Sequence, residues 1–270
     1  MKSEGLVAFF DVLGYQNIID NNSIDEVSII IRNVLQKMQD FAKEGFQKTF
    51  ENLIAAQETV DDIIERVQFR LISDSILLAL PFNEIGSSSD EGEAAKEKYY
   101  YCMLFFHYIY LILNRTFKEG LPLRGAVDYG KFFLEDNCFA GKPIIDCYRI
   151  GDSLEFSGCV VTPNCREILQ DICNKSNCEL DTIDSFGEDY LCPVKNGFEK
   201  YLLVLWSVDI ANEVGNDLRQ VVFEAFKAHN KDIGVGVERK ITNTEFTLRF
   251  LEQKEKENKR KKNGNQETKL

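Results

Sequence analysis

The chain has 270 residues, of which 44% are hydrophobic, enough for one sizeable core. Its formal net charge of −12 argues against general binding to nucleic acid or to an anionic membrane, because both need a basic surface. The eight cysteines follow no regular motif, and the N-terminus runs straight into a predicted strand, so we expect a reduced, cytoplasmic protein without a signal peptide or a disulfide framework.

The chain opens with a predicted strand and a predicted helix. Residues 5–12, GLVAFFDV, are apolar almost throughout and predict a central strand, interrupted only by the carboxylate of Asp11. Residues 23–46 predict a helix, because apolar residues recur every three or four positions and Ser23 is a suitable N-cap.

Two further short strands are predicted next. VQFRLI (67–72) and SILLALPF (75–82) form a predicted hairpin with Asp74 at its tip. Residues 98–114, in which five tyrosines and His107 interrupt the apolar side chains, predict a helix buried on more than one face, in the core or against a second subunit. We expect no membrane span there, since the apolar run of about 15 residues is short of the roughly 20 that a bilayer requires.

The second half of the chain is less regular, and residues 163–200 predict no clear element. The segments that do read as helix or strand are 121–134 (strand or hairpin), 141–155 (helix), 158–163 (short strand), 200–209 (strand) and 211–229 (helix). The order β-α-β-β-α-β is that of a ferredoxin-like core. We therefore expect an α+β fold, with helices packed on an antiparallel-rich sheet, over residues 1–240. Residues 241–270 are expected to form a helical, charged C-terminal tail.

Asp11 and Asp74 each lie where a predicted strand ends. On adjacent strands the two carboxylates would converge, and with the carbonyl of Val12 they would supply the oxygen ligands that Mg²⁺ and Mn²⁺ prefer. In a two-metal site one ion activates the attacking oxygen and the other stabilises the leaving group. The alternative is that Asp11 caps the following helix and Asp74 makes an Asx turn. The glycine three residues after the first acid and the hairpin tip at the second favour the metal site.

Leu13, Gly14 and Tyr15 lead from the first strand into a predicted helix. Helix N-termini favour anions, so we expect their backbone amides to face a triphosphate. A glycine at position 14 would let the backbone approach the phosphates closely.

Four segments in this order, FFDVLGYQ, RLISDSILLALP, LRGAVDYG and GKPIIDCYRI, resemble the class III nucleotidyl cyclase catalytic domain. They look most like the bacterial pyrimidine cyclases of the Pycsar anti-phage system, which make cyclic UMP or cyclic CMP. The resemblance covers residues 5–210 and rests on the order and spacing of short motifs. It implies a homodimer with active sites at the interface, two Mn²⁺ or Mg²⁺ ions per site, and attack of the ribose 3′-oxygen on the α-phosphorus with release of pyrophosphate.

The resemblance assigns roles to single residues. Asp11 and Asp74 match the metal-binding aspartates, and Val12 matches the carbonyl ligand. Arg149 falls where the transition-state arginine sits, and is expected to serve the partner's site by stabilising charge on the phosphates. Its alternative is an ordinary salt bridge, with Asp146 or Asp152.

This chain also departs from the family pattern. Ile145 stands where purine cyclases carry an asparagine, and Ser73 replaces the glycine before the second aspartate. Arg70 and Cys138 match the positions that read a purine. The donors of Arg70 suit O4 of uracil, or O2 of either pyrimidine, better than the amino group of cytosine. This favours UTP, although Arg70 as a surface salt bridge and Cys138 as a core residue remain alternatives.

Arg124 is a second arginine near the predicted site, either meeting phosphate or stiffening the sheet. The sequence thus predicts a uridylate cyclase that converts UTP to 3′,5′-cyclic UMP and pyrophosphate, a signal read by a separate effector protein in anti-phage defence. The alternatives are a cytidylate cyclase and a cyclase-like module that binds nucleotide without turnover. A palm-type polymerase or a diguanylate cyclase shares the core, but the acidic charge and the absence of a G-G-[DE]-E-F motif disfavour them.

Overall fold

The computed structural model describes residues 2–50, 57–135, 138–178, 181–206 and 217–267. The strands are β1 (Lys2–Val12), β2 (Gln68–Ile72), β3 (Ser75–Pro81), β4 (Leu123–Glu135), β5 (Cys138–Gly141), β6 (Gly158–Val161), β7 (Gly187–Val194) and β8 (Gly197–Val204). The helices are α1 (Tyr15–Asn21), α2 (Ile24–Ile30), η1 (Ile31–Leu35), α3 (Met38–Phe50), α4 (Gln57–Arg66), α5 (Glu91–Lys118), α6 (Lys142–Ser153), α7 (Pro163–Lys175), η3 (Ile183–Ser185), α9 (Leu218–Lys227) and α10 (Val235–Glu267).

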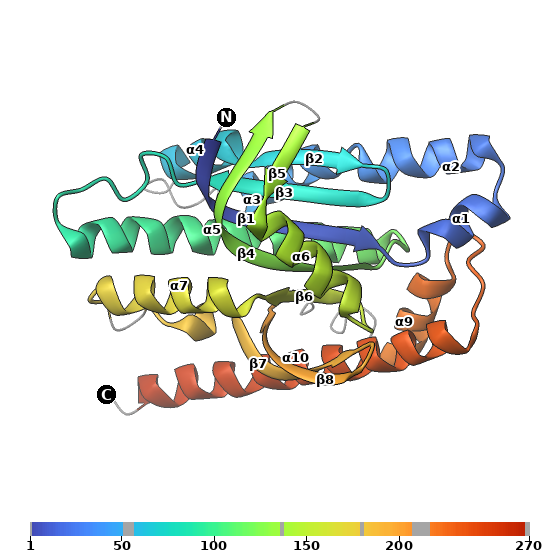
Figure 1. Cartoon of the computed structure of the whole chain (residues 1–270). Helices are drawn as coiled ribbons and strands as arrows, with labels where there is room; N and C mark the ends of the chain where they lie inside the picture. Colours follow the sequence, from blue (N-terminus) through green and yellow to red (C-terminus); the bar gives the residue numbers. More distant parts are fainter. Residues whose placement is uncertain (1, 51–56, 136–137, 179–180, 207–216, 268–270) are drawn as a thin grey trace.

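The described strands form one sheet in the order β2-β3-β1-β4-β6-β8-β7, with β5 paired to β4 beside this path. Neighbouring strands are antiparallel, except that β4 and β6 run parallel. The run β4-β1-β3-β2, with helices after β1 and after β3, has the ferredoxin-like arrangement. The expected α+β fold, with helices packed on an antiparallel-rich sheet, is confirmed (Figure 1).

The central strand β1 separates two layers of core, because successive side chains point to opposite faces of a sheet. Leu6, Ala8 and Phe10 belong to the main core, which also takes in the buried side chains of α5. Val7 lies on the other face in a smaller cluster with Ile144 of α6. Asp11 follows the same alternation, so its side chain is on the α6 face, at the end of the strand.

The long helix α5 confirms the expectation of burial on several faces. It is longer than the predicted 98–114, and fourteen of its side chains are buried. Asp90 begins it as a side-chain N-cap, 3.0 Å from the amide nitrogen of Glu93. No helix in the described part of the chain is long and apolar enough to cross a membrane.

Other boundaries differ from the sequence prediction. Ser23 does form the predicted cap, in a capping box with Glu26, but the single helix expected over 23–46 consists of α2, η1 and α3. The unassigned region 163–200 contains α7, whose first turn is capped by Thr162, as well as β7. Of the helix predicted over 211–229, the structure shows α9, while residues 207–216 lie outside the described residues.

The division expected at residue 240 falls inside α10, which continues to Glu267. Ile241, Leu248 and Leu251 recur on one face of this helix and are buried in the main core. Residues up to 251 therefore pack into the same core as the sheet.

Candidate active site

A cleft of about 440 Å³ opens at the end of β1. One wall is the continuous stretch 11–17, which leads from β1 into α1, together with Asp74 from the β2–β3 turn. Arg124 of β4 and Lys195 of the β7–β8 turn form a second wall. The third wall comes from α9 and α10, so segments from both ends of the chain meet at this point.

Asp11 and Asp74 are neighbours in this cleft because of the strand register. Asp11 pairs with Ser75, the residue after Asp74, and the amide of Val12 donates to the carbonyl of Asp74 at 3.1 Å. Burial raises the pKa of the Asp11 carboxyl, and the negative charge of Asp74 raises it as well, while Arg124 opposes both. Two carboxylates thus lie close enough to repel one another at a partly buried site.

This pair suits a hard divalent cation. Its donors are all oxygen atoms, and a cation would relieve the repulsion between the carboxylates. Among the residues that the structure describes, no cluster of three or more carboxylate, imidazole or thiol ligands forms. A cation held here would complete its coordination with water and phosphate oxygens, as Mg²⁺ commonly does. The cap alternative for Asp11 does not hold, since the N-cap of α1 is Gly14 and no side chain caps it.

The turn 13–15 only partly matches its expected role as an anion site. The amide of Leu13 donates to the carbonyl of Pro122 at 2.8 Å, so it is not available to a phosphate, and the expectation is corrected for this residue. Gly14 has a φ of +80°, and a Cβ there would lie 3.0 Å from Cδ of Lys231. The positive φ and the packing of Lys231 therefore favour glycine here, in addition to any approach of a ligand.

Lys231 is a buried cation beneath this turn, and sequence reasoning did not find it. Its Nζ donates to the carbonyls of Gly120 at 2.7 Å and of Ala225 at 3.1 Å. Burial lowers the pKa of its ammonium group to about 7. The side chain therefore ties the segment after α9 to the end of α5 and to α9, and its Cδ packs against Gly14.

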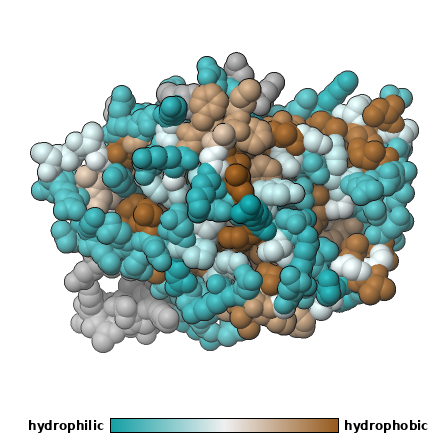
Figure 2. All heavy atoms as spheres, in the orientation of Figure 1, coloured by the Kyte–Doolittle hydropathy of each residue, from teal (hydrophilic) through white to brown (hydrophobic). Residues whose placement is uncertain are grey.

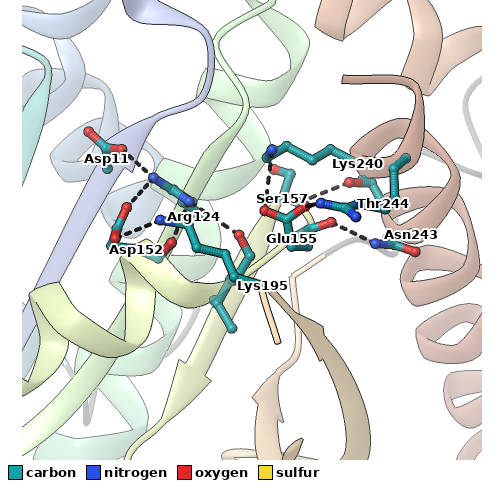
Figure 3. Close-up of polar contacts among 11 residues, drawn as sticks. Asp11, Arg124, Asp152, Glu155, Ser157, Lys195, Lys240, Asn243 and Thr244 are labelled. Atoms are coloured by element: carbon teal, nitrogen blue, oxygen red, sulfur yellow. Dashed lines mark hydrogen bonds and ion pairs between the residues drawn. The ribbon is translucent and has the colours of Figure 1, made fainter. Parts of the chain in front are cut away.

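Arg124 lies directly across the sheet from Asp11 in the β1–β4 register. Its Nη2 is 3.3 Å from Oδ2 of Asp11 and 2.7 Å from Oδ1 of Asp152. Lys195 reaches the second oxygen of Asp152 at 2.7 Å, and Figure 3 shows these side chains converging. Lys195 and Arg124 together lower the pKa of Asp152. Nη1 of Arg124 also donates to the carbonyls of Asp152 at 2.6 Å and Leu154 at 3.3 Å. Arg124 thus ties β4 to the end of α6 while it lines the cleft, which is compatible with both roles considered for it.

The structure does not bring the other predicted residues to this cleft within one chain. Arg149 is exposed on α6. The salt bridges considered for it are formed by other residues: Asp146 pairs with Lys142 at 2.7 Å, and Asp152 pairs with Arg124 and Lys195.

Arg70 and Cys138 do not line this cleft either. Arg70 is opposite Leu77 in the β2–β3 hairpin, and its Nη1 donates to the carbonyl of Phe69 at 2.9 Å. Cys138 is exposed and pairs with Glu135, at the end of β4 remote from Arg124. Its exposure excludes the core alternative.

No protein-family model matches the sequence, and no curated protein is similar to it. Among solved structures, the guanylyl cyclase Cya2 is 10% identical over 76% of this chain and 93% of its own, with a TM-score of 0.39. The catalytic core of a rhodopsin-guanylyl cyclase with converted specificity, in complex with ATPαS, is 12% identical over 76% of this chain and 96% of its own, with a TM-score of 0.41. A class III adenylyl cyclase-like ATP-binding protein from Pseudomonas aeruginosa is 13% identical over 63% of this chain and 36% of its own, with a TM-score of 0.33. At such identities and TM-scores, these similarities do not assign the chain to a family or an activity.

The sequence analysis did not identify four residues that line the cleft: Lys195, Phe226, Val237 and Lys240. Lys195 stands in V-K-N-G, which signals a turn between strands, but nothing local indicates that this turn faces Asp11. The residues of α9 and α10 carry no motif, and only the folded chain places them here.

Proposed function

We propose that this chain is a nucleotidyl cyclase and that the cleft at the end of β1 holds a nucleoside triphosphate. The observation that carries the proposal is the pairing of Asp11 with Asp74 in a cleft also lined by Arg124 and Lys195. Carboxylates suited to divalent cations thus lie beside cations suited to phosphates, which is the combination that transfer at a phosphoryl group requires.

Each residue has a defined part in this proposal. Asp11, Asp74 and the carbonyl of Val12 would hold two Mn²⁺ or Mg²⁺ ions, which supply activation of the ribose 3′-oxygen and neutralisation of the leaving pyrophosphate. Arg124 and Lys195 neutralise phosphate oxygens. Asp152 contacts both of these cations and so keeps them in position before the substrate binds. The 3′-hydroxyl gives up its proton to water, and its oxygen forms a bond to the α-phosphorus as the bond from that phosphorus to the α–β bridging oxygen breaks and pyrophosphate leaves.

The proposal includes a homodimer. Ile145 and Tyr148 on α6 and Phe139 on β5 are large hydrophobic side chains that remain exposed, and Figure 2 shows hydrophobic side chains gathered over the β4–β5 hairpin and around α6. Arg149 is exposed beside Ile145 and Tyr148 on α6. A second chain covering this face would bury the apolar side chains, and Arg149 would then reach the partner's cleft to stabilise the transition state.

We further propose UTP as the preferred substrate, with cyclic UMP serving as a cytoplasmic signal to a separate effector in anti-phage defence. The support is that Arg70 and Cys138 match the positions expected to read the base, and that guanidinium donors suit uracil O4. Because neither residue lines the cleft of its own chain, they would read the base in the cleft of the partner chain. Cytidylate cyclase activity is the nearest alternative, since O2 is common to both pyrimidines.

Incubation of the purified protein with each of the four nucleoside triphosphates and Mn²⁺, followed by mass spectrometry of the products, tests the activity. Cyclic UMP should predominate, and Asp74→Ala should abolish it without dissociating the dimer. Cyclic CMP as main product would change the base assignment alone. Binding of nucleotide without any product would favour the non-catalytic module, and linear oligonucleotides a polymerase.

Shared sites can be tested by complementation. Asp74→Ala and Arg149→Ala chains are each expected to be inactive as homodimers, but a mixed dimer would contain one site with both residues intact. Partial recovery of activity after mixing is therefore expected. Absence of recovery after subunit exchange has been verified would contradict the proposed role of Arg149 in the partner's site.

A further inference from the structure

The first turns of α10 form one wall of the cleft. Val237 and Lys240 line it and are three residues apart, so they lie on the same side of the helix. Ile241, Thr244 and Leu248 are buried. The first part of the helix is therefore held by packing, while its first two turns border the cleft that contains Asp11.

A polar network fixes this end of α10 against the segment that follows α6. Glu155 is 4% exposed, and its carbonyl accepts from Nδ2 of Asn243 at 2.9 Å. The amide of Ser157 donates to Oγ1 of Thr244, also at 2.9 Å. Figure 3 shows both contacts beside the cluster of Arg124, Asp152 and Lys195.

The loop before α10 is fixed as well, against α1. Nδ2 of Asn22 donates to the carbonyl of His229 at 2.8 Å, and Nδ2 of Asn21 to the carbonyl of Asn230 at the same distance. Because α1 itself begins at the cleft, α10 is held at both sides of it. The position of Lys240 is thus set by the fold and does not depend on a mobile tail.

The single negative charge of Glu155 is shared by two positively charged side chains, Arg239 and Lys240. Arg239 donates two hydrogen bonds to Oε2 of Glu155, from Nε at 3.0 Å and from Nη2 at 2.5 Å. Nζ of Lys240 is 3.4 Å from Oε1, a longer contact than the usual charge-assisted hydrogen bond. One carboxylate therefore faces two cations. The Arg239 side chain is 63% exposed, whereas that of Lys240 is 22% exposed and lines the cleft.

We infer that Lys240 of α10 is a binding residue for the terminal phosphates of the nucleoside triphosphate, which it contacts by turning from Glu155 into the cleft. This inference rests on the proposed nucleotide site and deepens it. Arg124, Lys195 and Lys240 line the same cleft, and Asp152 and Glu155 hold them when no phosphate is bound. A polyphosphate would offer Lys240 several oxygens in place of one shared carboxylate.

The matched variants are Lys240→Met and Arg239→Met. Each removes one cation from Glu155, but only the first removes a cation from the cleft wall. The probes are 3′-deoxy-UTP and 3′-deoxy-CTP, which lack the attacking hydroxyl, and inorganic tripolyphosphate, with the corresponding 3′-deoxy monophosphates for comparison. Calorimetry or a competition assay in Mg²⁺ gives the dissociation constants without any need for turnover.

Lys240→Met should weaken binding of the triphosphates and of tripolyphosphate by about tenfold, the usual effect of losing one charge-assisted hydrogen bond. The monophosphates should be affected much less, and Arg239→Met should leave all probes within about twofold. Lys240→Arg should restore most of the affinity. Thermal denaturation of each variant establishes that the fold persists.

Equal weakening by Lys240→Met and Arg239→Met would show that only the anchoring of α10 matters, and would overturn the inference. So would an unchanged affinity of Lys240→Met, or a loss independent of the number of phosphates. Failure of the proposed function has a different signature: the unsubstituted chain would then bind no triphosphate at all, and both proposals would fall. Binding by the unsubstituted chain without turnover would contradict catalysis while leaving the Lys240 test decisive.

Discussion

Lys231 allows a quantitative test of how the glycine turn is held. Burial lowers the pKa of its ammonium group from 10.5 to about 7. Between these values the unfolded chain binds a proton that the folded chain does not, so stability must rise with pH. The unfavourable contribution of burying the lysine is fully present below about pH 7 and disappears as the pH approaches the unfolded value. Each pH unit in this window changes the free energy of unfolding by about 1.4 kcal/mol.

The perturbation is Lys231→Met, studied by urea unfolding at several pH values from about 7 to about 10. The variant loses the bonds to the carbonyls of Gly120 and Ala225, which shifts its curve by an amount that does not depend on pH. As the pH rises, the free energy of unfolding of the unsubstituted chain should therefore increase relative to that of the variant. The increase should be on the order of 4 kcal/mol across three pH units. Parallel curves would mean that Lys231 keeps its proton throughout, and would refute the assignment of a buried, weakly basic lysine beneath Gly14.

Three further outcomes are expected. Mn²⁺ is expected to raise the melting temperature, and Asp74→Asn should abolish this rise. Without metal the variant should melt no lower than the unsubstituted chain, because repulsion with Asp11 is relieved. A retained Mn²⁺ shift in thermal denaturation would contradict the metal site. Gly14→Ala should lower the free energy of unfolding by about 1 kcal/mol or more, since alanine at a positive φ is strained; an unchanged urea midpoint would argue against that conformation. Leu248→Ala should cost about 2–5 kcal/mol in the same assay, and a change within error would mean that this part of α10 is not core.

The first half of the site could be predicted because its determinants are local. A continuous apolar run before Asp11 and a hairpin around Asp74 are each visible in the sequence, and antiparallel neighbours place the end of one strand beside the start of the next. Their convergence therefore follows from pairing alone. By the same logic α7 could have been predicted, since Thr162 before Pro163 is a common helix start, but the uneven distribution of apolar residues after it obscured the helix.

The second half could not be predicted, because it depends on packing across the whole chain. Lys195 lies in an ordinary turn, and Lys240 lies in a helix whose charged composition suggests a solvated tail. What places Lys240 is the burial of Ile241 and Leu248 together with the contacts of Glu155, which is 84 residues away in sequence from Arg239. No periodicity in α10 specifies which surface it will cover, so the identity of this wall is a property of the tertiary structure.

The cleft also accounts for how a chain of net charge −12 could select a polyanion. A long nucleic acid meets the summed field of the surface, which is repulsive, whereas a small polyphosphate that enters the cleft meets Arg124, Lys195 and Lys240 at short range. Asp152 and Glu155 form ion pairs with these cations, and under the proposed function phosphate oxygens would compete for them. Added salt should therefore weaken triphosphate binding less steeply in Lys240→Met than in the unsubstituted chain, because one fewer cation faces the ligand. An identical salt dependence would mean that Lys240 stays with Glu155 when the nucleotide is bound.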